Sequence, residues 1–389
     1  MERLKEIFIR VLFIGLGFCL IIVVITSTTG FKIQKNPMEN FFMQHESIDL
    51  ANINDSISRQ KVLEDIDYLV NTIEDVHPEP YFSISKDRFY FLVDSIKKLV
   101  PDEIIREDLY NLLKPLIGAL KDGHTSINFP ETSSSQDNKS NYENEHTDSV
   151  LILNYKSIAK SIGYIKFIDF VMDKTKFNYQ LNEIFEQVHN DFITDLIIDI
   201  RNNPGGNSEL TDILTNYIYN KPYKTNSKII VKRSEQYYSY TKGYFSWWFR
   251  PFLRFIKQIE DYRKTPIGEN YEEVKGAKSI IKPEYQFNGN KYLLINSNTF
   301  STALIFAAAF KDNKMGTIIG ERTKAEVNGF GDIYPFDLPN SRLWVWCSTK
   351  MFIRPSGEMT RGGLQPDIFI ADEGKRIIEF AIDFIENRE

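Results

Sequence analysis

Apolar positions recur with helical spacing through the first folded part of the chain. Behind Ser58, a candidate N-cap, apolar residues follow at intervals of three and four and predict a helix that ends at Pro78. The same spacing over 89–96 and 109–120 predicts two further amphipathic helices. Because each helix has one apolar face, we expect the three to pack together as a helical subdomain over residues 58–122.

From Leu151 the pattern changes to short β-rich runs separated by helical stretches. Such alternation is typical of an α/β core. The sequence therefore predicts a larger α/β domain over residues 123–389. The expected strands are 161–170, 196–200, 292–296 and 317–320, and the expected helices are 179–190, one from about residue 208, and 302–310.

Two stretches depart from this pattern. Residues 131–149 are rich in serine, asparagine, aspartate and glutamate, so we expect an exposed, disordered loop there. Residues 221–290 form an inserted segment, within which 243–257 is dense in aromatic residues and arginines. A packed hairpin or helix cover is the favoured interpretation of 243–257, and a lid or a contact with a membrane surface is the alternative.

The N-terminus is strongly apolar. Every position from 11 to 25 is apolar or glycine, and basic residues precede this run. We therefore predict a transmembrane helix or signal segment over residues 1–30, followed by a polar tether over 31–57. An uncleaved anchor is favoured over a cleaved signal peptide. The positive-inside rule then makes the membrane a partner and places the globular part outside the cytoplasm, in the periplasm or at the cell surface.

Composition narrows the function classes. With 47 Lys and Arg against 53 Asp and Glu, the net charge is −6, so no overall positive field attracts nucleic acid, and none is expected as a partner. The two cysteines, Cys19 and Cys347, lie far apart in the sequence and favour neither a disulfide framework nor a cysteine-ligated zinc. The histidines lack the paired spacing of metal ligands, so we expect no metal and no cofactor.

Two strand-to-helix turns carry candidate chemistry. The first follows Asp199 and ends at Gly206; its glycines allow close approach, and its N–H groups can stabilise negative charge, although an ordinary turn has the same appearance. The second leads into a helix at Ser301. This serine can be an N-cap or a nucleophile whose product is stabilised by the N–H of Thr302. Spacing alone leaves both interpretations open.

A histidine provides a third candidate. His124 follows Gly123, where the preceding helix is expected to stop, and it precedes a short strand-like run. With an unperturbed pKa of about 6.5, histidine can accept a proton from serine at neutral pH. A surface or capping histidine is the alternative interpretation.

In this order and at this spacing, the three segments resemble the tail-specific or C-terminal processing serine peptidases, a family that includes tricorn protease and the interphotoreceptor retinoid-binding protein modules. The resemblance covers about residues 59–367, without room for a PDZ module between His124 and Ser161. It implies a crotonase-like α/β core and a peptide or protein substrate. The matching motifs are V-H-P at 76–78, L-K-D-G-H-T at 120–125, D-I-R-N-N-P-G-G from 199, T-F-S at 299–301, G-E-R-T at 320–323 and G-L-Q-P-D at 363–367.

The resemblance also implies roles for single residues. Ser301 would attack the scissile carbonyl, and backbone N–H groups of Gly205, Gly206 and Thr302 would hold the oxyanion. An extended peptide would lie against a strand edge near this site.

The identity of the base follows from a comparison within the family. Its members use either a lysine or a histidine, and the position of the lysine is Glu326 in this chain, with Lys324 two residues before it. His124 is therefore the favoured base. Glu358, the glutamate nearest before the G-L-Q-P-D element, is the candidate for orienting its ring.

Two further positions differ from the family pattern. Leu304 stands where a glutamate is frequent, and Gly123 stands where tricorn-like sites have a serine. Together with Glu326 at the position of the lysine, these differences motivate an alternative function, a catalytically inactive protein that uses the same fold to bind a peptide or a lipophilic ligand.

Overall fold

The computed structural model describes residues 55–129, 153–245, 249–371 and 375–387. By their contacts these residues form two compact units. The smaller contains Arg233–Ile267, and the larger contains the described residues of Asp49–Lys232 and Gly268–Glu389.

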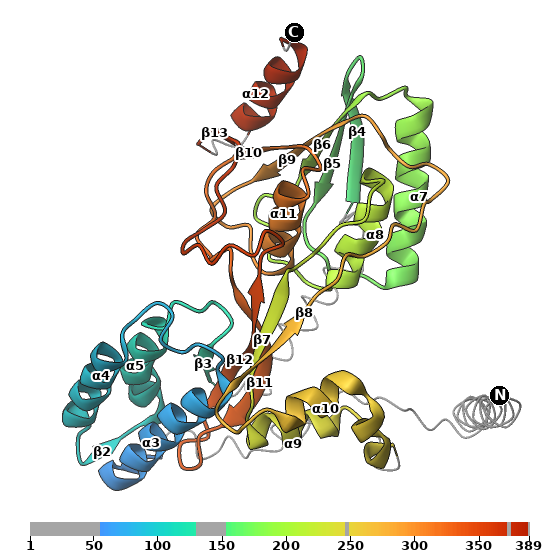
Figure 1. Ribbon diagram of the computed structural model, residues 1–389. Helices are drawn as coiled ribbons and strands as arrows, with labels where there is room; N and C mark the ends of the chain where they lie inside the picture. The colour runs from blue at the N-terminus through green and yellow to red at the C-terminus, as the bar shows by residue number, and fades with distance from the viewer. Residues whose placement is uncertain (1–54, 130–152, 246–248, 372–374, 388–389) are drawn as a thin grey trace, which may run out of the picture. The chain divides into compact units, whose positions relative to one another are not determined.

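The larger unit contains a mostly parallel sheet of six strands (Figure 1). Its strand order is β13-β10-β9-β6-β5-β4, and all neighbours are parallel except β4, which pairs antiparallel with β5 at one edge. The strands are β4 (Leu153–Ala159), β5 (Ile162–Phe167), β6 (Asp195–Asp199), β9 (Asn290–Ile295), β10 (Thr317–Gly320) and β13 (Ile368–Phe369).

Both faces of this sheet are buried. Because side chains alternate along a strand, Leu196 and Ile198 of β6 contact one core cluster, while Ile197 between them contacts another. The first cluster also contains residues of α7 (Lys174–Asn190), α8 (Ser208–Ile218) and α11 (Thr302–Asp312), and the second contains residues of α12 (Lys375–Glu386). Burial on both faces explains the nearly continuous apolar runs of the parallel strands.

A second, antiparallel sheet lies in the same unit. Its central strand is β12, which pairs with β11 on one side and, at its two ends, with β3 and β7 on the other. The strand β8 adds to β7. The bounds are β3 (Ser126–Asn128), β7 (Lys228–Lys232), β8 (Asn270–Val274), β11 (Phe330–Asp337) and β12 (Trp344–Ile353).

The helical subdomain contains α3, α4 and α5, which form where the apolar spacing predicts them. Helix α3 begins after Ser58, as expected. Helix α5 ends at Gly118 rather than at Gly123, and turns continue the chain toward His124. The prediction that this helix stops at Gly123 was therefore wrong, because the helix ends more than one helical turn earlier. The bounds are β1 (Ile57–Ser58), α3 (Arg59–Val76), α4 (Lys86–Leu99), β2 (Glu103–Ile104) and α5 (Arg106–Gly118).

The smaller unit contains α9 (Glu235–Gly243), the 3₁₀ helix η3 (Arg250–Phe255) and α10 (Lys257–Lys264). Aromatic side chains supply its packing. Tyr262 is buried, its hydroxyl accepts the N–H of Ser234 at 3.1 Å, and the Arg233 guanidinium lies 5.3 Å from its ring centre. The interpretations of residues 243–257 as a packed cover, a lid or a membrane contact stay predictions.

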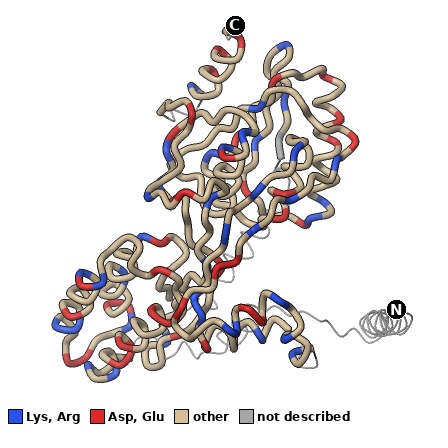
Figure 2. The backbone as a smooth tube through the Cα atoms, viewed as in Figure 1, with Lys and Arg blue, Asp and Glu red and all other residues tan. Residues whose placement is uncertain are grey.

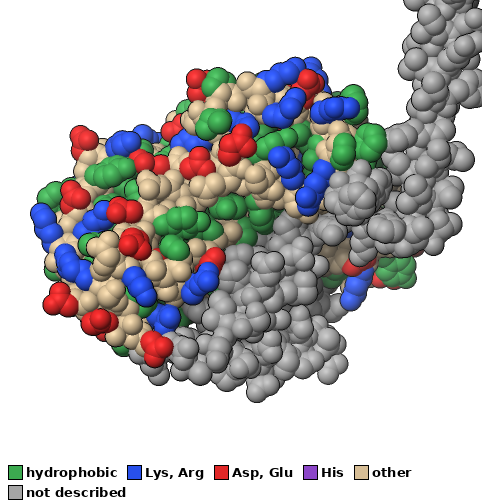
Figure 3. All heavy atoms as spheres, turned by 90° about the horizontal axis from the view of Figure 1, so that it is seen from below, with side chains coloured by type: hydrophobic (Ala, Val, Ile, Leu, Met, Phe, Trp, Pro, Cys, Tyr) green, Lys and Arg blue, Asp and Glu red, His purple; other side chains and the backbone are tan. Residues whose placement is uncertain are grey.

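Charged residues of both signs are distributed along the described backbone (Figure 2). On the face shown in Figure 3, lysines and arginines lie among aspartates and glutamates. Elsewhere in the described residues, charged side chains form ion pairs, such as Lys278 with Asp212 and Lys311 with Asp367, each at 2.7 Å. Exposed pairs of this kind contribute little to stability individually, but they balance charge locally.

The mixed α/β fold is confirmed. Within the described residues, no helix combines the length and the apolar character needed to cross a bilayer. The apolar run at 11–25, most of the tether at 31–57 and the polar loop at 131–149 lie outside the described residues.

Candidate active site

Ser301 occupies the sharp turn between β9 and α11. Its backbone has φ 52° and ψ −126°, in the left-handed region that a residue with a side chain seldom adopts. Although Ser301 holds the N-cap position, its hydroxyl accepts no hydrogen bond from the helix. A strained serine on a strand-to-helix turn is the geometry of an exposed nucleophile, because the turn directs the hydroxyl away from the backbone.

His124 lies on the loop between α5 and β3. Its Nε2 is 3.0 Å from Ser301 Oγ. Its ring stacks on Phe300, with ring centres 4.8 Å apart and planes inclined by 21°. Gly123 lies against the same ring, since a Cβ at this position would be 2.7 Å from the Phe300 ring.

The charge state of His124 follows from its surroundings. Burial lowers its pKa below the usual value of histidine, while the charges of Asp122 and Asp332 act in the opposite direction. Burial is the strongest of these effects, so the ring is neutral at pH 7 and can accept a proton.

Asp122 is a buried carboxylate next to His124. Its Oδ1 accepts the backbone N–H of His124 at 3.0 Å and lies 4.0 Å from the ring Nδ1. Its Oδ2 accepts the Thr125 hydroxyl at 2.6 Å and contacts His77 Nε2 at 3.2 Å. Burial acts to raise the pKa of Asp122, but the hydrogen bond from His77, with smaller contributions from Ser348 and Thr125, acts in the opposite direction, and the pKa is lowered to about 2. The sequence analysis did not single out Asp122 or His77, although both lie in its matching motifs.

The glycine turn after β6 approaches Ser301 closely. Gly205 has φ +99°, and a Cβ there would lie 2.8 Å from both Ser301 Cβ and Thr302 N. Its own N–H donates to Asn203 Oδ1 at 2.8 Å, which makes it unavailable to an oxyanion. The predicted donor role of Gly205 is therefore wrong; glycine is needed at this position for the close approach.

Gly206 and Thr302 remain as the candidate donors. Both line the cleft at Ser301, and the Thr302 hydroxyl donates to the Gly206 carbonyl at 2.7 Å, which holds the two segments together. Among the hydrogen bonds of the described residues, none uses the N–H of Gly206 or of Thr302. Thr302 is also the first residue of α11, where the helix dipole favours negative charge.

Buried polar contacts fix the two turns relative to each other. Arg201 donates from Nε and Nη2 to the two carboxylate oxygens of Asp199, at 2.9 and 2.7 Å. Asn202 and Asn296, one from each turn, exchange two hydrogen bonds of 3.0 and 2.9 Å. The two asparagines therefore connect the glycine turn to the turn of Ser301, while the Asp199–Arg201 pair holds the first turn in place.

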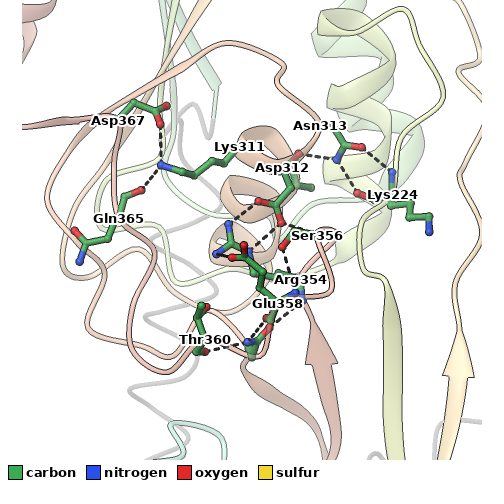
Figure 4. Close-up of polar contacts among 12 residues, drawn as sticks. Lys224, Lys311, Asp312, Asn313, Arg354, Ser356, Glu358, Thr360, Gln365 and Asp367 are labelled. Carbon is green, nitrogen blue, oxygen red and sulfur yellow. Dashed lines mark hydrogen bonds and ion pairs between the residues drawn. The ribbon is translucent and has the colours of Figure 1, made fainter.

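Glu358 does not contact His124. Its carboxylate is exposed and lies 3.7 Å from the Arg354 guanidinium, in the cluster of Figure 4. Arg354 is itself held by Asp312 at the end of α11 through contacts of 2.9 and 2.5 Å. This anchor keeps the loop of Glu358 away from the ring, so the predicted orienting role of Glu358 is wrong. The carboxylate that contacts His124 is Asp122.

Glu326, which stands at the position of the lysine base in the family pattern, makes a different contact in this chain. The Glu326 carboxylate accepts the backbone N–H of Gly362. Lys324 lines the cleft, but its ammonium contacts Asn298 Oδ1 at 3.3 Å rather than Ser301. Leu304, on α11, is buried in the core cluster on one face of the parallel sheet. The geometry therefore pairs Ser301 with a histidine.

Ser301 and His124 open into a cleft of about 890 Å³. Apolar side chains of Ile229, Phe330 and Phe352 form part of its wall. Among the described residues, no group of three or more His, Cys, Asp and Glu is arranged to hold a metal ion.

The model of peptidase family S41 matches residues 161–370, more than half of the 389 residues. The chain belongs to peptidase family S41. The resemblance predicted from its motifs is confirmed, and this S41 protein is a serine-type peptidase. No curated protein sequence matches it.

Solved structures support the fold of this S41 peptidase. A candidate peptidase from Parabacteroides merdae is 19% identical, with a TM-score of 0.55 over 85% of this chain and 97% of its own. Mature CPAF in complex with lactacystin is 13% identical, with a TM-score of 0.60 over 84% and 98%. A serine-to-alanine mutant of CPAF is also 13% identical, with a TM-score of 0.61 over 84% and 96%.

Proposed function

We propose that this S41 peptidase hydrolyses peptide bonds through an acyl-enzyme formed on Ser301, with His124 as the base. The observation that carries the proposal is the 3.0 Å separation between His124 Nε2 and the hydroxyl of a strained serine. The parallel sheet with its flanking helices supports the crotonase-like core that the motifs imply.

The reaction has two stages. In the first, His124 takes the proton of Ser301 while Oγ attacks the scissile carbonyl carbon, and the carbonyl oxygen becomes an oxyanion. When the C–N bond breaks, His124 gives its proton to the leaving amine, and an ester remains on Ser301. In the second, water attacks this ester with His124 again as the base, which releases a carboxylate and restores the serine.

The N–H groups of Gly206 and Thr302 stabilise the oxyanion. Each lines the cleft beside Ser301. Donors that are already in place need no reorganisation when charge develops, and for this reason such groups contribute several kcal/mol to catalysis, about 3 for one donor.

The substrate is an extended peptide. Among the described strands, β11 pairs only with β12, and its residues Phe330, Gly331 and Asp332 line the cleft. A peptide can add to this edge through backbone hydrogen bonds, with its scissile bond at Ser301. Recognition through the backbone fits a peptidase that accepts many sequences.

A fluorophosphonate probe tests the nucleophile. Wild-type protein should be labelled at Ser301, and Ser301→Ala should lose the labelling while its circular dichroism stays unchanged. Labelling that persists in the variant rules out Ser301. An unlabelled wild type favours the alternative, an inactive protein that binds a peptide or lipophilic ligand.

We further propose that the apolar N-terminal run anchors this peptidase with its catalytic part outside the cytoplasm. The run at 11–25, with basic residues before it, supports this topology. Protease digestion of intact cells, followed by detection of a C-terminal tag, distinguishes an extracytoplasmic from an internal location.

A further inference from the structure

A buried carboxylate and a buried histidine lie behind the base. We propose that Asp122 and His77 are positioning residues for His124, and that they do in this chain what an orienting glutamate does elsewhere. This proposal rests on the proposed function of Ser301 and His124.

Asp122 acts on His124 in two ways. Its Oδ1 accepts the backbone N–H of His124 at 3.0 Å, which fixes the loop. The same oxygen lies 4.0 Å from ring Nδ1, too far for a direct hydrogen bond but close enough for charge to favour a hydrogen on Nδ1. A hydrogen on Nδ1 leaves Nε2 free to accept the proton of Ser301.

His77 holds Asp122 in turn. The backbone N–H of Glu79 donates to His77 Nδ1 at 3.1 Å, which leaves Nε2 as the ring nitrogen that can donate a hydrogen. This Nε2 hydrogen points to Asp122 Oδ2 at 3.2 Å. Only 1% of His77 is exposed, so its ring has one fixed orientation.

The pair also connects the helical subdomain to the cleft. His77 follows the last residue of α3, and its ring centre lies 4.6 Å from that of Phe330 on β11. Phe330 lines the cleft, so His77 contacts both the carboxylate behind His124 and the wall beside it.

Several polar and charged groups face this network, and they define the expected pH dependence. Ser301 faces His124 from the turn before α11, and Asp332 acts on His124 from β11. Thr125 and His77 face Asp122. The charge of Asp122 raises the pKa of His124, and removal of that charge should therefore move the acid limb of activity to lower pH.

The test measures fluorophosphonate labelling of the full chain as a function of probe concentration and pH. Asp122→Asn keeps the shape but removes the charge. His77→Phe keeps a ring against Phe330 but removes the donor, and His77→Gln restores a donor. Asp65→Asn is the matched control, because Asp65 is a buried carboxylate on α3 that also accepts backbone N–H groups.

We expect Asp122→Asn to lower the maximal labelling rate about 100-fold with little change in probe affinity, and to shift the acid limb to lower pH. His77→Phe should lower the same rate about 10-fold, and His77→Gln should recover part of the loss. Asp65→Asn should lower the melting temperature and leave the labelling rate of the folded protein unchanged.

Wild-type rates and pH profiles in the folded Asp122 and His77 variants would overturn the proposal. If Asp122→Asn does not fold, the comparison of His77→Phe with His77→Gln tests the proposal instead. Equal labelling rates for these two variants contradict the assignment. A wild-type chain that is never labelled at Ser301 removes the proposed function and, with it, this role.

Discussion

At the scale of single residues, the site depends on a histidine that stays uncharged. Burial removes water from the His124 ring and penalises the protonated form. Asp122 and Asp332 act against this effect, but they are weaker than burial. A neutral ring 3.0 Å from Ser301 can accept the hydroxyl proton at neutral pH without prior deprotonation.

The loss of activity at acid pH should therefore occur below the pH range in which a free histidine titrates. Because a protonated ring cannot act as a base, kcat/KM should fall as the pH drops through the pKa of His124, and this pKa is lowered. Initial rates on a peptide substrate between pH 4 and 9 measure the limb. An acid limb above that of free histidine, or near-full activity in His124→Ala, would contradict the assignment.

The sequence predicted part of this site. Ser301 and His124 could be identified because each lies in a short motif whose local geometry determines its exposure. Glu358 was misplaced because its position depends on a loop that Asp312 and Arg354 hold by a contact between distant segments. Asp122 carried a sequence signal, two residues before the histidine, but nothing local indicated that its side chain turns back toward the ring.

At the scale of elements, two strand-to-helix turns must meet for the oxyanion to be stabilised. The turn after β6 carries Gly206, and the turn after β9 carries Ser301 and Thr302. Neighbouring parallel strands end at the same edge of the sheet, which brings the two turns together. Because Gly205 has no Cβ, its backbone can lie directly against Ser301 and Thr302.

Gly205→Ala should therefore reduce activity severely. The added methyl group would lie 2.8 Å from Ser301 Cβ, and φ +99° is unfavourable for alanine, so the turns must separate. A displacement of about 1 Å at the donors can cost about 100-fold in rate. Gly118→Ala is the control, since nothing lies within 4 Å of its new Cβ, and it should keep wild-type activity in the same peptide assay. Equal activities of the two variants would refute this explanation.

The parallel strands and their helices were predictable because each carries its own periodic pattern. The antiparallel sheet was not. Strand β12 pairs with β3, more than 200 residues earlier, and with β7, more than 100 residues earlier. Its pairing depends on partners from three other parts of the chain, and no local periodicity identifies them.

At the scale of the whole larger unit, polar contacts attach the helical subdomain to the antiparallel sheet. Asp65 of α3 makes this connection. Its carboxylate is fully buried and accepts the backbone N–H groups of Asn340 at 2.9 Å and Ser341 at 2.8 Å, in the turn between β11 and β12. Arg106 of α5 donates to the Ser341 carbonyl at 2.8 Å.

Asp65→Asn should consequently destabilise the fold by about 2 kcal/mol, since one buried N–H loses its acceptor and the asparagine amide adds a donor where only donors converge. Asp67→Asn, on the same helix but in an exposed pair with Lys97, should change stability by less than about 0.5 kcal/mol. Urea unfolding followed by circular dichroism measures both variants against wild type. Equal destabilisation would show that α3 and the β11–β12 hairpin are held by apolar packing alone, whereas the predicted difference shows that the buried carboxylate of Asp65 stabilises the attachment of α3 to this hairpin.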